Sequence, residues 1–248
     1  MENFIPFLGI AKKAALISGT FLKENFSQHN EASFDDGRDI KLKIDIESEK
    51  LILRILKENS DIPILSEESG VSEDLGQTYW VVDPLDGSSN YYRKIRICAV
   101  SIALMHKGSP ILGVINDFMN DDLYYGLKNK GAFRNDLKIG VSSTQLANKG
   151  TIMSGIPAKQ NYSKEEFASM IEVFQLWKKV RMIGSAAIAN LYVADGRADC
   201  YKEKDTFIWD VAAGAIIVEE AGGLAILSEI KNDFRVDAEF TNGRLAQK

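Results

Sequence analysis

The chain has 248 residues, 45% of them hydrophobic, which is enough for a sizeable core in one domain or two closely packed halves. Its net charge of −5 argues against a protein that binds the nucleic-acid backbone, because such proteins carry a basic patch or stripe. Cys98 and Cys200 match no zinc spacing and favour buried thiols in a reducing compartment. No leader-like run or bilayer-spanning stretch is expected, so we predict a cytoplasmic protein without a membrane partner.

Two helical patterns flank a polar segment near the N-terminus. Apolar residues recur at near-helical spacing from Phe4 to Phe26, which predicts a packing helix. The polar segment from Ser27 to Arg38 is typical of a mobile loop or hairpin tip, whose acids we expect to be solvated rather than metal-bound. Asp45 directly precedes the second apolar pattern, which begins at Ile46, so by sequence alone it is best interpreted as a helix cap.

A short strand is predicted from Ile62 to Leu65, and two acidic residues, Glu67 and Glu68, follow it. Neighbouring side chains of a strand point to opposite faces of the sheet. At most one of these two carboxylates can therefore face a shared site.

The stretch beginning at Tyr79 carries the strongest chemical signal. The run Tyr79–Val82 predicts a buried strand, and Asp83 and Asp86 follow it, with Pro84 expected to turn the chain between them. Gly87 and two hydroxyl residues come next, and such small residues let backbone N–H groups approach an anion, especially at a helix start. Acids beside an anion cradle fit a divalent cation that binds phosphate; an Asx-type turn is the alternative.

The remaining pattern predicts a mixed α and β chain. A hairpin is followed by a sheet meander to Arg134, a strand, a capped helix, a second strand and two further helices. The predicted elements are Cys98–His106, Ile111–Asn116, Thr151–Ser154, a helix capped by Ser163 and Glu166 that reaches about Trp177, Lys179–Ile183, a helix towards Ala194, Ala198–Glu203, and a helix from about Phe207 to Gly222.

The sequence leaves the roles of two sites in the second half of the chain undecided. Gly184, Ser185 and Ala186 lie between a predicted strand and helix, where they could present N–H groups to a ligand or simply allow helix packing. Asp210 lies near a helix start, where it is either a partner for the N-terminal charge of the helix or a ligand.

In combination these acids resemble the inositol monophosphatase family of Mg²⁺-dependent, lithium-sensitive phosphatases. The resemblance covers nearly the whole chain and rests on three motifs in order: Glu67-Glu68-Ser69, Asp83-Pro84-Leu85-Asp86-Gly87-Ser88, and Trp209–Gly214 with Glu220-Ala221-Gly222-Gly223. Two positions depart from the family pattern, since Lys41-Leu42-Lys43-Ile44 precedes Asp45 and Ser66 replaces the usual glycine of the first motif.

The resemblance implies a metal site, a substrate site and a mechanism. The implied ligands of two or three Mg²⁺ ions are Glu67, Asp83, the carbonyl of Leu85, Asp86 and Asp210. The implied substrate contacts are Asp86, Gly87, Ser88, Gly184, Ser185, Ala186, Glu203 and Asp210. The implied reaction is in-line hydrolysis without a phosphoenzyme, in which Glu67 and the pair formed by Ser88 and Asp45 orient the attacking water and accept its proton.

The family also sets the expected fold and partners. We expect an α+β or α/β protein with the layered αβαβα sandwich shared with fructose-1,6-bisphosphatases, in one domain of residues 1–248. Residues 1–145 would form an α+β half with the metal site, and residues 146–248 an α/β half that completes the substrate pocket. The resemblance implies a homodimer and a small phosphorylated substrate; no nucleic-acid or membrane partner is expected.

Glu203 favours inositol monophosphate or a related sugar or polyol phosphate, because a carboxylate accepts hydrogen bonds from vicinal hydroxyls and repels a second phosphate. The flanking residues Lys202 and Lys204 weaken that argument. A 3′(2′),5′-bisphosphate nucleotidase and a non-catalytic binding member of the family are the alternatives. A fructose-1,6-bisphosphatase is also an alternative, although those chains are considerably longer.

Overall fold

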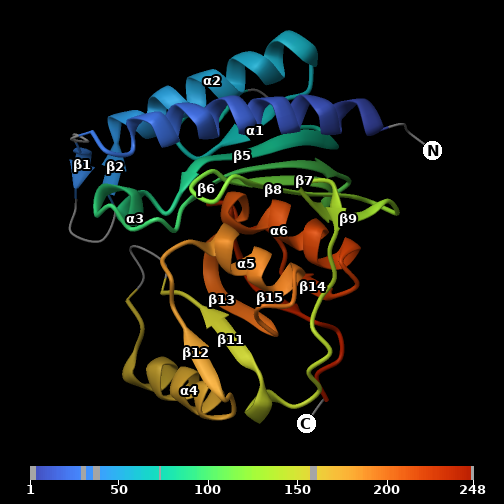
Figure 1. The fold of residues 1–248 in the computed structure, drawn as a ribbon. Helices are drawn as coiled ribbons and strands as arrows, with labels where there is room; N and C mark the ends of the chain where they lie inside the picture. Colours follow the sequence, from blue (N-terminus) through green and yellow to red (C-terminus); the bar gives the residue numbers. More distant parts are fainter. Residues whose placement is uncertain (1–3, 29–31, 36–39, 73, 157–160, 247–248) are drawn as a thin grey trace.

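A computed structural model describes residues 4–28, 32–35, 40–72, 74–156 and 161–246. Helices and sheets alternate in five layers, as the αβαβα prediction requires (Figure 1). Helices α1 (Ile5–Asn25) and α2 (Lys43–Asn59) cover one face of the larger sheet, and α5 (Ala186–Ala194) and α6 (Ile208–Glu220) lie between the two sheets. Helix α4 (Lys164–Gln175) lies at the far end, beyond the smaller sheet.

The larger sheet has eight strands in the order β10-β9-β8-β7-β6-β5-β3-β4. Its strands are β3 (Ile64–Ser66), β4 (Gly70–Val71), β5 (Thr78–Asp86), β6 (Ala99–His106), β7 (Ser109–Asp117), β8 (Asp122–Leu127), β9 (Gly131–Arg134) and β10 (Leu137–Lys138). Among the described strands of this sheet, β3 and β5 form the one parallel pair. The predicted hairpin and meander are therefore confirmed.

The smaller sheet has five strands in the order β12-β11-β13-β15-β14. Its strands are β11 (Thr151–Ser154), β12 (Lys179–Arg181), β13 (Cys200–Phe207), β14 (Leu224–Leu227) and β15 (Arg235–Thr241). Strand β11 runs parallel to both β12 and β13, whereas β15 runs antiparallel to its neighbours β13 and β14. A short 3₁₀ helix, Ala147–Lys149, leads into β11.

Strand β5 divides the apolar core into two parts. Trp80 and Val82 contribute to the core under α1 and α2, and Tyr79 and Val81 contribute to the core around α5 and α6. This alternation follows from the two-residue period of a strand, because both faces of the sheet are covered by helices. Burial of both faces explains why the sequence of β5 is almost continuously apolar.

Helix α6 approaches the larger sheet very closely. A Cβ atom at Gly113 of β7 would lie 2.4 Å from the carbonyl oxygen of Ala213, and one at Gly126 of β8 would lie 3.1 Å from Cα of Ile217. Both positions therefore need glycine because the α6 backbone occupies the space of a side chain.

Three expectations need correction or restriction. Residues 78–86 form one strand, so Pro84 does not turn the chain out of the sheet; it lies at a β-bulge opposite β6, where its missing N–H costs no ladder hydrogen bond. The described part of the Ser27–Arg38 segment contains β1 (Ala32–Asp35), which pairs with β2 (Ile40–Leu42) and supports the hairpin interpretation. His29, Asp36, Gly37 and Arg38 lie outside the described residues.

The expectation that no stretch is long enough to span a bilayer is wrong in length and composition. Helix α1 has 21 residues and a mean hydropathy of 1.3 over its most apolar window. However, one side of α1 is a core surface: Asn116 donates a hydrogen bond of 2.9 Å to the carbonyl of Ala15, and the Tyr91 hydroxyl donates one of 2.7 Å to Leu22. In this structure α1 is part of the outer helical layer.

Candidate metal and phosphate site

The site begins at the bulged end of β5. Asp83 and Asp86 are both buried, and the backbone N–H of Leu85 donates a 3.0 Å hydrogen bond to Asp83 Oδ1. The bulge places two residues of β5 between the pairing positions of Asp83 and Asp86, which lets both carboxylates face the α6 side.

Gly87 has a φ of +86° and forms the N-terminal cap of the short helix α3 (Ser88–Tyr92). A Cβ atom there would lie 2.8 Å from the carbonyl oxygen of Ile97 and 3.2 Å from that of Gly184, so both conformation and space require glycine. The Ser88 hydroxyl donates a 2.9 Å hydrogen bond to the carbonyl of Leu85. These contacts hold the turn that follows the two acids.

Asp210 completes a group of three carboxylates. It lies in the first turn of α6, where it accepts hydrogen bonds from the Thr206 hydroxyl at 2.8 Å and the Phe207 N–H at 3.2 Å. One oxygen each from Asp83, Asp86 and Asp210 lies within 4.8 Å of the others. Asp210, which is 124 positions from Asp86 in the sequence, therefore joins Asp83 and Asp86 in a site that a single divalent cation could occupy.

Glu67 is the fourth acid of the group, because its carboxyl group lies next to that of Asp83 and close to Asp210, whose charge helps to raise its pKa. A cation bound between these carboxyl groups would offset the repulsion that helps to raise the pKa values of both. Of the neighbouring pair, Glu67 therefore faces the site. Both residues lie in the turn after β3, which ends at Ser66, so the expected alternation of strand faces does not apply to them.

Glu49, one turn after Asp45 on α2, holds the turn that carries Glu67. Its Oε1 accepts hydrogen bonds from the Ser66 hydroxyl, from the Glu68 N–H at 3.2 Å and from the Ser69 N–H at 3.1 Å. Ser66, which replaces the family's usual glycine, thus has a specific partner. The neighbouring residue Ser48 donates a 2.8 Å hydrogen bond to the carbonyl of Pro84.

Sequence reasoning missed Ser48 and Glu49, although a signal was present. Asp45, Ser48 and Glu49 are spaced by three and four residues and form one polar, buried face of α2. Asp45 itself accepts a 2.8 Å hydrogen bond from the Leu42 N–H, which is the capping role that its sequence position indicated.

Asp86 is bound from the second half of the chain. The Ser185 hydroxyl and the Ala187 N–H both donate to Asp86 Oδ2, the latter at 2.7 Å, and Ser185 also caps α5. The Ser185 side chain is therefore directed to an acid of the site. Ala186 begins α5 directly after Ser185, and so it lies beside the carboxylate of Asp86.

Asn90 is a third residue that sequence reasoning missed. Its side-chain amide donates to the carbonyls of Ile97 at 2.8 Å, Ile183 at 2.7 Å and Gly184 at 3.2 Å. It therefore joins the Gly87 turn to the turn that begins α5, and no sequence pattern announces this role.

Burial and mutual repulsion raise the pKa values of these acids. Burial is the main cause in every case: it raises the pKa of Asp86 to about 6 and that of Asp210, with a further contribution from Asp86, to about 7. The pKa values of Glu67 and Asp83 are raised well above their usual range by burial and then by neighbouring carboxylates. A cation would reverse this repulsion, so the donor set fits a divalent metal ion.

Glu203 on β13 lies beside this group. Burial, and then the charge of Asp210, raises its pKa to about 8, and the Tyr201 hydroxyl donates a 3.0 Å hydrogen bond to Glu203 Oε2. A Cβ atom at Gly155 would lie 2.3 Å from the same oxygen, so the end of β11 packs directly against the carboxyl group.

The family profile described as "Inositol monophosphatase family" matches residues 5–239. The chain belongs to the inositol monophosphatase family. It is 34% identical to Nus factor SuhB of Pasteurella multocida, over 88% of this chain and 84% of that protein. It is 33% identical to fructose-1,6-bisphosphatase/inositol-1-monophosphatase of Aquifex aeolicus, over 92% of this chain and 88% of that protein.

Solved structures of this inositol monophosphatase family share the fold. The structure of inositol monophosphatase from Anabaena matches with a TM-score of 0.85 and 34% identity, over 98% of this chain and 93% of that one. An inositol monophosphatase structure from Thermotoga maritima matches with a TM-score of 0.81 and 28% identity, over 96% and 92% of the two chains. The layered fold is thus that of inositol monophosphatases, and some of these relatives are named as phosphatases.

Replacing Glu49 by Gln should weaken metal binding while the protein stays folded. The amide would still accept hydrogen bonds, but the weaker bonds to Ser66, Glu68 and Ser69 would loosen the turn that carries Glu67. We expect the concentration of divalent metal ion for half-maximal phosphate release to rise by about tenfold. Glu47→Gln, an exposed neighbour on the same helix, is the control and should leave it unchanged. Equal effects of the two variants would show that Glu49 has no special role.

Proposed function

We propose that this chain is a Mg²⁺-dependent phosphomonoesterase that hydrolyses inositol monophosphate or a related sugar or polyol phosphate. The observation that carries the proposal is the convergence of Asp83, Asp86 and Asp210, with oxygens within 4.8 Å of one another, and of Glu67, which lies next to Asp83. Family membership makes phosphate-ester hydrolysis the chemistry to which such a group of acids belongs.

Mg²⁺ fits the donors that the chain offers. The candidate ligands are carboxylate oxygens together with the carbonyl of Leu85, and hard oxygen donors of this kind suit Mg²⁺ or Mn²⁺ rather than zinc. When bound, Mg²⁺ would lower the pKa of a water molecule and offset the charge of the phosphate group.

The chain's own residues would position the reactants. Glu67 and the pair of Asp45 and Ser88 are proposed to orient the attacking water and accept its proton. The backbone N–H groups of Gly87 and Ser88 are proposed to bind phosphate oxygens, with the positive φ of Gly87 setting their direction. Asp86 is fixed by the Ser185 hydroxyl and the Ala187 N–H, so little reorganisation would be needed when metal binds.

Substrate hydroxyl groups are proposed to bind Glu203 and the residues at the start of α5, Gly184 to Ala186. The partly buried carboxyl group of Glu203 already has one donor, Tyr201, and retains further hydrogen-bonding capacity for a vicinal diol. This supports a polyol phosphate over a 3′(2′),5′-bisphosphate nucleotide.

A phosphate-release panel tests the proposal. Inositol 1-phosphate, a sugar phosphate and 3′-phosphoadenosine 5′-phosphate should be compared with EDTA, with Mg²⁺, and with Mg²⁺ plus Li⁺. We expect Mg²⁺-dependent release that is fastest with the first two compounds and is inhibited by Li⁺. Fastest release from the nucleotide would favour the nucleotidase alternative, and absence of release from every ester would refute the proposed function.

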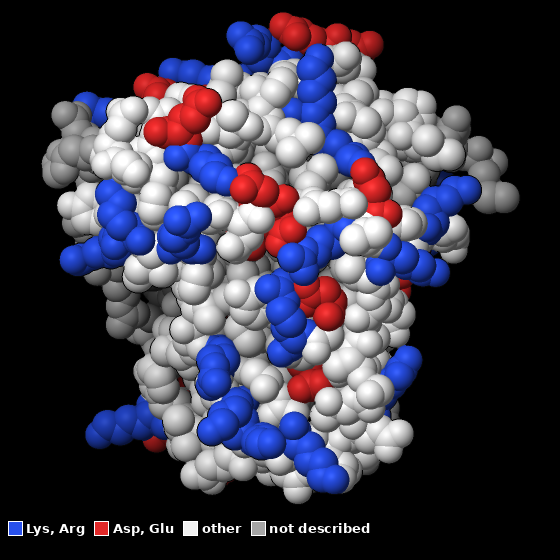
Figure 2. All heavy atoms as spheres, viewed as in Figure 1, with Lys and Arg blue, Asp and Glu red and all other residues white. Residues whose placement is uncertain are grey.

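A binding role is the alternative that such a refutation would favour. Several relatives bear the name Nus factor SuhB, and this name describes those relatives and not this chain. On the face drawn in Figure 2, basic side chains predominate and acidic ones lie among them. We propose a protein without a nucleic-acid partner because the net charge of the chain is −5. We also propose, from family membership, a homodimer in the cytoplasm; the molar mass in solution tests the dimer.

A further inference from the structure

Next to Glu203, a cavity of about 320 Å³ lies between α4, the end of β11 and the middle of β13. One wall consists of Ser154, Gly155 and the segment Lys202–Lys204. The opposite wall consists of residues of α4 and of Tyr162, which precedes it. The volume is within the range of pockets that hold small organic ligands.

The wall formed by α4 is apolar at its C-terminal part. Met170, Val173 and Phe174, spaced by three and four residues, form one stripe of the helix and line the cavity together with Ser169. An amphipathic helix normally buries such a stripe in a core, but these three side chains are only half-buried and belong to neither of the two cores described above.

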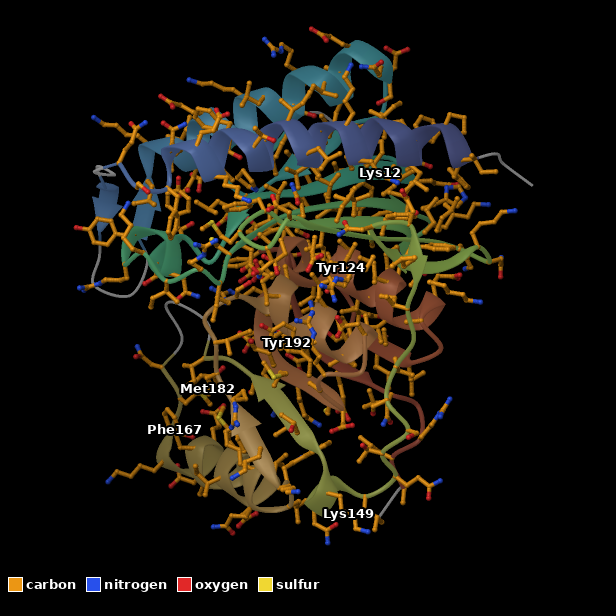
Figure 3. The ribbon with its side chains drawn as sticks, in the orientation of Figure 1. Lys12, Tyr124, Lys149, Phe167, Met182 and Tyr192 are labelled. Atoms are coloured by element: carbon orange, nitrogen blue, oxygen red, sulfur yellow. The ribbon has the colours of Figure 1, made fainter. Side chains whose placement is uncertain are left out.

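The N-terminus of α4 is fixed where the cavity begins. Ser163 and Glu166 form a reciprocal capping box, and the Tyr162 ring packs edge-on against Phe167, with 5.5 Å between ring centroids. Phe167 and Met182 mark this end of the molecule, away from Tyr124 in the larger sheet (Figure 3). The apolar stripe is therefore held over the smaller sheet by an ordered helix start.

Glu203 connects the cavity to the acidic group. It lines the cavity, and its pKa is raised in part by the charges of Asp210 and Asp86, so its carboxyl group lies close to both. A phosphate ester bound at the acids, with a hydroxyl group on Glu203, would direct any further part of its organic group toward α4.

We propose that this cavity is a substrate subsite for a flat apolar ring, so that the preferred substrate is a phosphate ester whose hydroxylated part carries such a ring. A polyol alone would leave Met170, Val173 and Phe174 facing water, whereas a ring would cover them and stack near Phe174 and Tyr162. An aryl glycoside phosphate and a nucleoside phosphate both have this chemistry. The inference rests on the proposed function and specifies its substrate class.

Two matched pairs of substrates test the subsite. Glucose 6-phosphate is compared with phenyl glucoside 6-phosphate, and ribose 5-phosphate with adenosine 5′-phosphate, so each pair differs by the ring. In at least one pair we expect kcat/KM to be about tenfold higher for the ring-bearing compound. The pair that shows the difference identifies the source of the ring, and no difference in either pair would overturn the inference.

Filling the cavity provides the matched variants. Met170→Trp should abolish the preference for the ring and change kcat/KM of the ring-free compounds by less than about twofold. Ala168→Trp places the same bulk on the opposite, exposed side of α4 and should preserve the preference. An equal loss for ring-bearing and ring-free compounds in Met170→Trp, with an unchanged thermal unfolding curve, would refute the subsite.

Binding of phosphate-free compounds separates this inference from the proposed function. Saturation-transfer NMR with phenyl glucoside and adenosine should show ring protons in contact with the wild-type protein and with Ala168→Trp, but not with Met170→Trp. This result would stand even if no ester were hydrolysed. Ring contacts that persist unchanged in Met170→Trp would overturn the subsite, even in an active phosphatase.

Discussion

Asp83→Asn should lower Mg²⁺-dependent kcat/KM by about a thousandfold or more, because it removes a negative oxygen from the centre of the acidic group. The fold should persist. Asn can keep its oxygen toward the Leu85 N–H, which lies 3.0 Å from Asp83 Oδ1, and can donate its amide protons to Glu67. Phosphate release at saturating Mg²⁺ and circular dichroism measure the two effects.

The same variant should be more stable than the wild type when no metal is present. Asp83 is buried among Glu67, Asp86 and Asp210, whose charges raise its pKa, so a neutral amide relieves repulsion that the folded state otherwise bears. We expect a higher Tm in EDTA.

Asp199→Asn is the control, because Asp199 is a buried acid with a structural role. It accepts hydrogen bonds from the Thr151 N–H at 2.7 Å and from the Ser142 hydroxyl. Its replacement should lower Tm and preserve Mg²⁺-dependent turnover. Near-normal turnover in Asp83→Asn would show that Asp83 is not a metal ligand.

The metal-free protein should lose stability as the pH rises from about 5 to about 8.5. The folded-state pKa values of Asp86, Asp210 and Glu203, about 6, about 7 and about 8, all lie above the ordinary values of 3.8, 3.8 and 4.5. The folded state therefore binds more protons than the unfolded state in this interval. The stabilisation is complete below the unfolded-state values and is lost as the pH passes the folded-state values.

Thermal unfolding in EDTA and in Mg²⁺ tests whether stability falls as the pH rises. In EDTA, Tm should fall with rising pH, and Mg²⁺ should raise Tm more at about pH 8 than at about pH 5, because only deprotonated carboxylates bind the ion. Glu203→Gln should flatten the upper part of the EDTA curve. A Tm in EDTA that rises between about pH 6 and 8.5 would contradict the raised pKa values.

Residues whose role is local could be predicted from the sequence. The spacing of Ser163 and Glu166 predicts a capping box, and the structure confirms it. Asp83, Asp86 and Asp210 were identified by their motifs, and the structure brings them together. The layered fold followed from the same resemblance, because the motifs extend over most of the chain.

Features that depend on tertiary partners could not be predicted. Pro84 by itself indicates a turn, and only the pairing of β5 with β6 shows that it lies in a bulge. Glu49 and Asn90 gain their roles from backbone groups that lie distant in sequence, Ser69 and Gly184 among them. The half-buried stripe of α4 likewise has the sequence pattern of a core helix.

The close packing of α6 against β7 and β8 has a consequence for synthesis. The eight-stranded sheet is complete once Lys138 has left the ribosome, but α6 ends only at Glu220. Until then, the nascent chain exposes the apolar face that includes Ala103, Ile115 and Tyr124. Chaperones or early contacts within the chain must therefore cover the inner face of the sheet while some 80 further residues, counted from Lys138 to Glu220, are translated.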